Sequence, residues 1–288
     1  MGIVDALGEG FRLVFRRPTL LAIPVLVDIL LQMLPPLSIR DLLLRSFGSN
    51  EAMSGLPPVA LSPLLTFFIP STVGFASGGK LVDSEAVELG GVGSALAIAA
   101  VFTVVGMVIA AAYLGAVAGA VRSRALGPGM LDYVVSRFPR LMGLTLAVLG
   151  AMSVSIALLM LVMGVVPVLG QLLVLIVAAA FFSALFVLFF AVVALMVEDV
   201  SIRGSIECSL ELLKAHAGPA TLFIVVSTLI NVGLSVIWIT LLSSAPGLIV
   251  AVVANALVGT AIAAGSMLFY LSRMHEDEFR DMTPDSGA

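Results

Sequence analysis

Six apolar segments of the sequence are long enough, or nearly long enough, to cross a lipid bilayer. A helix needs about 20 mostly apolar residues to span the hydrocarbon core. Hydrophobic residues make up 60% of the chain and charged residues only 11%, whereas about 25% charged residues are usual in a water-soluble protein. We therefore predict an all-α, polytopic membrane protein with one transmembrane domain, residues 1–271. The predicted spans are residues 20–37, 92–121, 141–166, 171–197, 220–242 and 247–271.

Two stretches of the chain fall outside these predicted spans. Residues 38–91 form an irregular, extracytoplasmic insertion, in which residues 56–76 are apolar but interrupted by prolines. We interpret residues 56–76 as a partly embedded or re-entrant element, because a seventh span would move the later arginines to the outer side. Residues 272–288 are acidic and are predicted to form a solvated cytoplasmic tail.

Amphipathic helices are expected before three of the spans. The clearest one follows Glu198 and Asp199, with Asp199 or Ser201 as the natural N-cap. One stripe of this helix is apolar, and it consists of Ile202, Ile206, Leu210, Leu213 and Ala217. The other stripe is charged and consists of Arg203, Glu207, Glu211 and Lys214. Such a helix lies most economically at the bilayer surface, with its apolar stripe toward lipid or neighbouring spans.

Similar patterns at residues 3–16 and 131–140 suggest that this unit occurs three times. The predicted architecture is therefore three transmembrane hairpins, each preceded by a cytoplasmic amphipathic interfacial helix. With both termini inside the cell, only Arg40, Arg45 and Lys80 of the 14 basic residues lie outside. Because basic residues accumulate in cytoplasmic segments, we expect a multi-pass protein of the cell membrane with both termini cytoplasmic.

Four polar residues fall inside predicted spans and form a candidate intramembrane polar site: Asp28, Gln32, Asn231 and Asn255. A mid-span carboxylate is costly and usually faces the bundle interior or water. Asp28 is therefore either a proton or cation relay, or a protonated or hydrogen-bonded carboxyl group packed against Asn or Ser of another helix. The two asparagines either line a polar path or form interhelical hydrogen bonds.

Gly115 and Gly119 form a G-x-x-x-G pair, which lets two helix backbones approach closely. The pair indicates helix packing within the bundle or, as the alternative, dimerisation. We interpret both glycines as packing residues.

The sequence points to no catalytic, cofactor or metal site. The one cysteine, Cys208, excludes an internal disulfide, and the two histidines, His216 and His275, lack a second ligand at metal-site spacing. A net charge of -4 argues against nucleic-acid binding. The expected partners are membrane lipids, with another membrane protein or a second copy of the chain as further candidates.

Several residues near the amphipathic helices carry a resemblance to a known group of proteins. They are Glu198-Asp199, Ser205-Ile206, Ser209-Leu210, Lys214 and the Arg17-Pro18 pair. Around them the chain resembles six-span membrane proteins related to the membrane domain that precedes some glycerophosphodiester phosphodiesterases. The resemblance implies an integral membrane fold with cytoplasmic amphipathic helices and no established activity. The catalytic histidine and metal-binding carboxylates of the phosphodiesterase domain have no counterpart here, so the resemblance does not imply hydrolysis.

Three functions are compatible with these features. The preferred hypothesis is a non-enzymatic membrane protein that organises lipid or a partner protein through its cytoplasmic amphipathic helices. The alternative is a transporter or channel for a small or amphiphilic solute, built around Asp28, Gln32, Asn231 and Asn255. A membrane-embedded lipid enzyme is the third hypothesis, but it lacks a nucleophile with a base, paired acids or a metal site.

Overall fold

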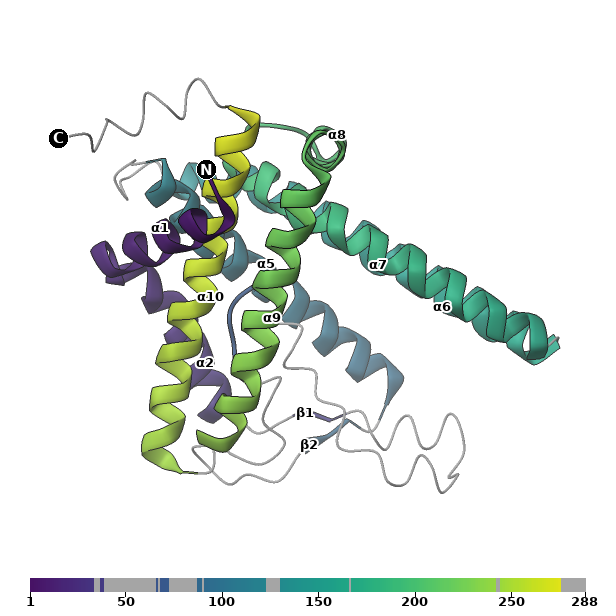
Figure 1. Cartoon of the computed structure of the whole chain (residues 1–288). Helices are drawn as coiled ribbons and strands as arrows, with labels where there is room; N and C mark the ends of the chain where they lie inside the picture. Colours follow the sequence, from purple (N-terminus) through teal and green to yellow (C-terminus); the bar gives the residue numbers. More distant parts are fainter. Residues whose placement is uncertain are drawn as a thin grey trace. The chain divides into compact units, whose positions relative to one another are not determined.

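The computed structural model of the chain is helical (Figure 1). It describes residues 1–33, 37–38, 66, 68–72, 87–89, 91–122, 130–165, 167–241 and 244–275. Most of the predicted insertion 38–91 and most of the acidic tail therefore lie outside the described residues. The elements are α1 (Ile3–Arg16), the 3-10 helix η1 (Pro18–Leu21), α2 (Ala22–Met33), β1 (Leu37–Ser38), β2 (Val87–Glu88), α5 (Val92–Val121), α6 (Met130–Val165), α7 (Pro167–Val197), α8 (Ile202–Ala215), α9 (Ala217–Leu241) and α10 (Ala245–Met274).

Five of these helices are long and apolar enough to cross a membrane, namely α5, α6, α7, α9 and α10. The protein is therefore a multi-pass membrane protein. The first predicted span, residues 20–37, corresponds to η1 and to α2, which has 12 residues. At about 1.5 Å per residue, α2 is about 18 Å long and by itself does not cross a core of about 30 Å. The two strands β1 and β2 pair in parallel over two residues each.

The predicted separate amphipathic helix at residues 131–140 is not found. These residues belong to α6, which continues through Pro139 without a break. A proline removes one backbone donor and usually bends or ends a helix. Arg137 and Arg140, on either side of the proline, bind the end of α7 and the segment that follows it.

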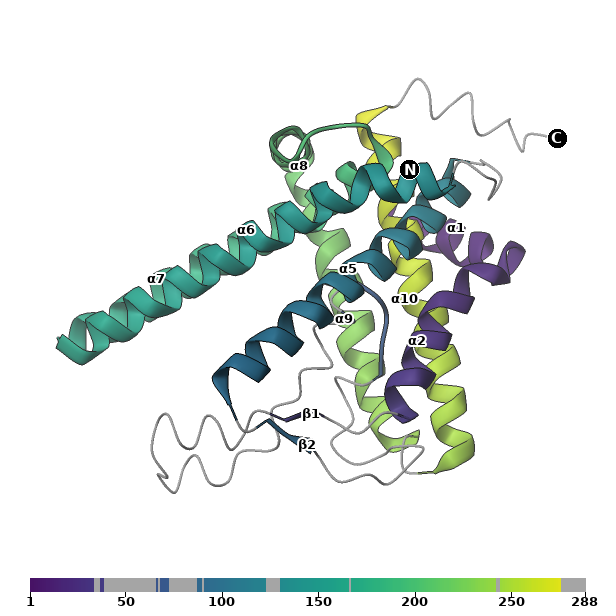
Figure 2. The same cartoon turned by 180° about the vertical axis from the view of Figure 1, so that it is seen from behind.

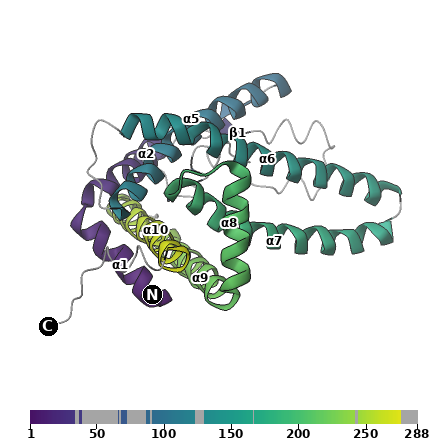
Figure 3. The same cartoon turned by 90° about the horizontal axis from the view of Figure 1, so that it is seen from above.

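The described chain divides into two compact units. The first unit comprises Met1–Ala6, Leu131–Val226 and Ser266–Ala288. In it α6 and α7 run in opposite directions as a hairpin, and α8 crosses the end of α7 (Figure 3). Phenylalanine rings form its core, with centroids 5.1 Å apart for Phe189 and Phe190 and 4.8 Å apart for Phe223 and Phe269.

The second unit comprises Leu7–Met130 and Ser227–Gly265. In it α2 lies beside α10 (Figure 2), and Val25 and Ile29 of α2 pack against a core that includes Trp238 of α9 and Leu248 of α10. The Tyr113 hydroxyl of α5 donates a hydrogen bond to Thr260 Oγ1 of α10 at 3.0 Å. Together these contacts join α2, α5 and the hairpin of α9 and α10.

Gly10 marks a close approach between α1 and α10 in this unit. A Cβ atom at Gly10 would lie 2.9 Å from the Gly265 nitrogen and 3.2 Å from the Gly265 Cα, and closer still to the Ala261 carbonyl oxygen. Only glycine fits this crossing, because all three neighbours are backbone atoms that cannot turn away.

Candidate functional site

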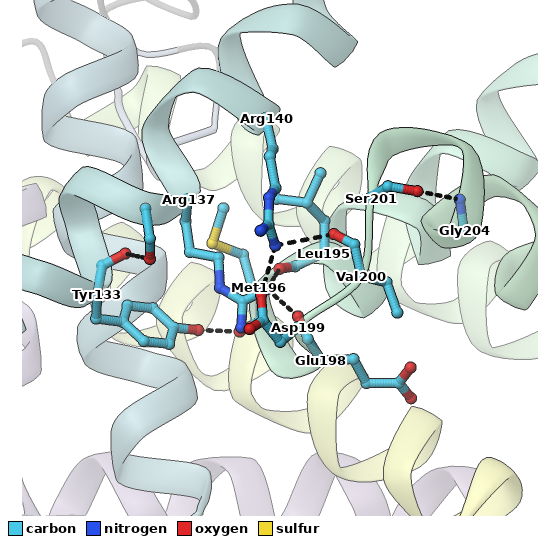
Figure 4. Close-up of polar contacts among 11 residues, drawn as sticks. Tyr133, Arg137, Arg140, Leu195, Met196, Glu198, Asp199, Val200, Ser201 and Gly204 are labelled. Atoms are coloured by element: carbon cyan, nitrogen blue, oxygen red, sulfur yellow. Dashed lines mark hydrogen bonds and ion pairs between the residues drawn. The ribbon is translucent and has the colours of Figure 1, made fainter.

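The segment between α7 and α8 is held by side chains of α6 (Figure 4). The last carbonyl groups of a helix have no partner within the helix and need donors from elsewhere. Arg137 Nη1 donates to the Leu195 carbonyl oxygen at 3.0 Å and also to that of Glu198. The Tyr133 hydroxyl donates to the carbonyl oxygen of Met196. Two side chains of α6 therefore satisfy the end of α7.

Asp199 binds the same two arginines through its side chain. Its Oδ1 lies 2.5 Å from Arg140 Nη1 and 3.4 Å from Arg137 Nη1. The hydrogen bond from Arg140 lowers the pKa of Asp199, and the positive charges of Arg137 and Arg140 lower this pKa further. Because the Asp199 side chain is 78% exposed, solvent screens these pairs, and they orient the segment more than they stabilise it.

Glu198 turns its carboxylate toward α10. The Tyr270 hydroxyl donates to Glu198 Oε1 at 2.7 Å, and His275 Nε2 lies 2.8 Å from the same oxygen. The Cys208 thiol of α8 lies 3.8 Å from Glu198 Oε2. Glu198 thus links the start of α8 to the end of α10. We call Arg137, Arg140, Glu198, Asp199, Tyr270 and His275 the polar junction.

The thiol in contact with the polar junction is not activated for nucleophilic attack. Burial raises the pKa of Cys208, and the nearby negative charge of Glu198 raises it further. A thiol with a raised pKa stays protonated and reacts slowly. Among the residues that the structure describes, no group of three or more His, Cys, Asp or Glu side chains could hold a metal ion.

Ser201 caps α8, which confirms one of the two caps that the sequence predicted. Its Oγ accepts a hydrogen bond from the Gly204 nitrogen at 3.1 Å. Glu198 and Asp199, the acidic residues before the helix, are instead engaged in the polar junction.

α8 packs against α7 through a face that the sequence analysis overlooked. This face consists of Ser205, Ser209 and Leu212, which are all buried, and Ser209 Oγ donates to the Val187 carbonyl oxygen of α7 at 2.6 Å. Small serine side chains let two helix backbones come close. Their four-residue spacing was visible in the sequence, but serine on a helix is more often exposed.

The two predicted stripes of α8 are left outside this packing face. The charged residues Arg203, Glu207, Glu211 and Lys214 are all exposed, and Arg203 Nε bonds Glu207 Oε1 at 2.7 Å. On the apolar stripe, Leu210 is 37% exposed, while Ile206 and Leu213 are half-buried. An apolar surface therefore remains uncovered between the packed face and the charged face.

Several chain segments meet at this end of the first unit. Arg273 Nη2, at the end of α10, donates to the Met1 carbonyl oxygen at 3.2 Å. The polar junction already joins the start of α6, the end of α7 and the end of α10. The N-terminal residue and the end of the last helix therefore lie at the same end of the first unit.

A second polar cluster surrounds Asp28 in the second unit. Its Oδ1 accepts from Ser71 Oγ at 2.7 Å, and its Oδ2 accepts from the Thr72 nitrogen at 2.9 Å and from Thr72 Oγ1 at 2.8 Å. Gln32 Nε2 donates to Thr72 Oγ1 at 3.2 Å. Asp28 is only 1% exposed. Three donors therefore converge on the two carboxyl oxygens of Asp28.

This geometry resembles the second of the two interpretations of Asp28, a hydrogen-bonded carboxyl group in contact with a serine. The serine comes from a short segment within the predicted insertion, and not from another span. Ser71 and Thr72 were not among the residues predicted for this site. The available signal was a pair of hydroxyl residues directly after Pro70 in a segment otherwise predicted to be embedded.

The other members of the predicted polar site lie in different environments. Asn255 of α10 is buried, whereas Asn231 of α9 is exposed. The hydrogen bonds of this cluster join Asp28 and Gln32 to Ser71 and Thr72. Of the predicted packing glycines, Gly115 is buried, but an added Cβ at Gly119 would meet no atom within 4 Å. The packing role of this pair stays a prediction.

Replacing Asp28 with asparagine should loosen the segment at residues 71–72. An asparagine side chain keeps one acceptor oxygen and replaces the other with an NH2 donor, so a hydroxyl of Ser71 or Thr72 must turn round to accept, or lose its partner. We expect a loss of about 1–3 kcal/mol in the free energy of unfolding, and faster hydrogen exchange at the Thr72 amide. The control is Asp132→Asn, because Asp132 is exposed on α6. If both variants exchange at the wild-type rate, Asp28 does not anchor this segment.

Comparison with known proteins assigns no relative: no protein-family model, no curated protein and no solved structure matches the chain. The resemblance to the six-span group therefore stays a prediction, and the function has to be argued from the geometry above.

Proposed function

We propose that the protein organises lipid at the cytoplasmic face of the cell membrane and is not an enzyme. In this proposal the chain crosses the bilayer six times in three hairpins, with η1 and α2 together in the first crossing. Both termini are inside the cell, and α8 lies in the interface. A partner protein bound by the same surface is compatible with this role. The resemblance to the six-span group is consistent with the proposal.

The proposal rests mainly on how α8 is attached to the other helices of the first unit. Its Ser205, Ser209 and Leu212 face is buried, and its start is tied to α6 and α10 through the polar junction. Its apolar residues remain partly uncovered beside a fully exposed row of charges. A helix with adjacent apolar and charged surfaces suits the boundary between acyl chains and headgroups.

The charges around α8 support its placement on the cytoplasmic side. Arg137, Arg140 and Arg273 all lie at the end of the first unit where α8 is attached. Basic residues at the ends of spans favour the cytoplasmic side. The contact between Arg273 and Met1 supports both termini lying on that side, because it brings the chain's beginning to the end of α10.

The polar groups support a role without chemistry. Glu198 is engaged by Tyr270 and His275, and the raised pKa of Cys208 keeps its thiol protonated. The carboxylate of Asp28 is occupied by three donors. We therefore propose a packing role for Asp28, and rank the transporter as the less favoured alternative.

The proposal is tested by locating the two faces of α8 in liposomes. In a Cys208→Ser background, Leu210→Cys and Glu207→Cys each carry an environment-sensitive fluorophore. We expect the label at position 210 to emit at shorter wavelength and to be quenched by spin-labelled lipid. The label at position 207, one turn away on the charged face, should report water. Two labels that both report water would overturn the interfacial placement of α8.

The lipid-organising role itself requires a second measurement. A phospholipid spin-labelled near its glycerol backbone reports how many lipids the protein immobilises. Leu210→Asp should reduce this immobilised fraction, because a carboxylate on the apolar stripe repels the acyl region. Glu207→Gln, on the charged face, should leave it unchanged. An equal immobilised fraction in all three proteins would contradict the role.

A further inference from the structure

Pro70 packs against the middle of α10, where the short dark-blue segment of residues 68–72 lies beside this helix (Figure 2). A Cβ atom added at Gly259 would overlap Cβ and Cγ of Pro70 and would lie 3.6 Å from its Cα, so the proline ring rests directly on the glycine. At about 1.5 Å per residue, Gly259 is about 21 Å along α10 from Ala245 and about 22 Å from Met274. α10 is long enough to cross the bilayer, and this crossing places Pro70 near the middle of the membrane.

The same segment is attached to α2 at a second point. The buried carboxyl group of Asp28 accepts hydrogen bonds from Ser71 Oγ, from Thr72 Oγ1 and from the Thr72 nitrogen. Gln32 adds a hydrogen bond to Thr72 Oγ1. The segment is therefore held by both α2 and α10 within the second unit.

The backbone at residues 69–72 is not helical, yet it is suited to the interior of a membrane. The Ile69 nitrogen donates to the Thr66 carbonyl oxygen at 3.1 Å, and the Thr72 nitrogen donates to Asp28. Pro70 has no N–H group to satisfy. Non-helical backbone is tolerated at membrane depth where protein covers it or where it lines a water-filled cavity. Ile69 and Thr72 are both buried, so here protein covers it.

The chain reaches this segment and leaves it on one side of the membrane. β1 precedes the segment and β2 follows it, and the two strands pair with Leu37 opposite Val87. α5 begins at Val92, shortly after β2, so both strands lie on the side of the membrane where α5 begins. A segment that reaches the middle of the bilayer between two such strands is re-entrant.

We infer that residues 69–72 form a re-entrant element whose depth is set by Gly259, on which Pro70 rests, and by Asp28, which binds Ser71 and Thr72. Asp28 is in this role a positioning residue, because it holds the element at the level of the middle of α10. The inference depends on α10 crossing the bilayer and not on α8 binding lipid. It and the proposed function can therefore fail separately.

Quenching of tryptophan fluorescence by brominated phospholipids tests the depth of the element. Trp238, the one tryptophan of the chain, is replaced by phenylalanine, and Phe68→Trp then places a reporter about 7 Å at most from Pro70. In liposomes of the full chain, we expect emission at short wavelength and stronger quenching by lipid brominated near the acyl-chain ends than by lipid brominated near the headgroup. Val87→Trp, on the exposed residue of β2, should emit at longer wavelength and show the opposite order of quenching. Stronger headgroup quenching at position 68 would overturn the inference.

Gly259→Ala and Gly233→Ala make the same chemical change at two positions of the second unit. The methyl group at Gly259 would collide with the Pro70 ring, whereas an added Cβ at Gly233 would meet no atom within 4 Å. Gly259→Ala should therefore shift the reporter at position 68 toward headgroup quenching, and Gly233→Ala should leave it at its original depth.

Asp28→Ala acts on the other attachment and should shift the reporter in the same direction as Gly259→Ala. Unchanged deep quenching in both Gly259→Ala and Asp28→Ala would overturn the role of these two residues in setting the depth. The depth itself is read from Phe68→Trp alone, so that reading does not depend on either variant folding.

Discussion

Replacing Gly10 with alanine should destabilise the protein strongly. The added methyl group would lie 2.9 Å from the Gly265 nitrogen of α10 and would also overlap the Ala261 carbonyl oxygen. Because these are backbone atoms within a helix, α1 would have to move away from α10. Overpacking of this kind costs about 1–3 kcal/mol, and more where the backbone cannot shift. The apparent unfolding temperature of the purified protein in detergent should fall accordingly.

Gly8, two residues earlier on the same helix, is the matched control. An alanine side chain at Gly8 would meet no atom within 4 Å. Alanine favours the helix over glycine by about 1 kcal/mol, so Gly8→Ala should raise the unfolding temperature. The two variants make the same chemical change and should have opposite effects. A lower unfolding temperature for both variants would mean that α1 tolerates no added methyl group at either position. A higher unfolding temperature for both would contradict the close crossing of α1 and α10.

Replacing Arg137 with methionine should release the end of α7. The Arg137 side chain is only 7% exposed, and it donates to the carbonyl oxygens of Leu195 and Glu198. Methionine fills similar space but leaves these buried acceptors without a donor. Hydrogen bonds from a charged group contribute about 1.5–3 kcal/mol each, so we expect a loss of about 3 kcal/mol in the free energy of unfolding.

Arg140→Met provides the comparison for this prediction. Arg140 is more exposed, and its partner Asp199 lies largely in solvent, so the loss should be much smaller than for Arg137→Met. Limited proteolysis between α7 and α8 measures the same difference locally, with faster cleavage for Arg137→Met. Equal losses for the two variants would show that the ion pairs with Asp199, and not the bonds to the helix end, hold the polar junction.

Local features of the sequence were sufficient to predict the long apolar helices and some of their ends. The predicted span 92–121 coincides with α5, and the predicted end of another span at residue 197 coincides with the end of α7. Ser201 was one of two predicted caps for α8. These features depend on apolar length and on residues close in sequence, so they are readable without knowing what packs where.

Other features depend on residues far apart in the chain. Arg137 and Arg140 of α6 bind acceptors 58 and 60 positions later, at the end of α7 and in the segment after it. The same is true of Asp28, whose partners Ser71 and Thr72 follow more than 40 positions later. A local pattern marks such residues as unusual, but it does not identify their partners.

The sequence by itself determined that this chain is a helical, multi-pass membrane protein, because lipid as a solvent demands long apolar helices whose backbone groups bond internally. Only the tertiary structure decided which surface of each helix is covered. α8 packs through its serines, leaving its apolar stripe open, and α9 leaves Asn231 exposed. The physical reason is that lipid is as apolar as leucine, so hydropathy does not distinguish a lipid-facing surface from a packed one. Close contact and hydrogen bonding make that choice, and both are properties of pairs of helices.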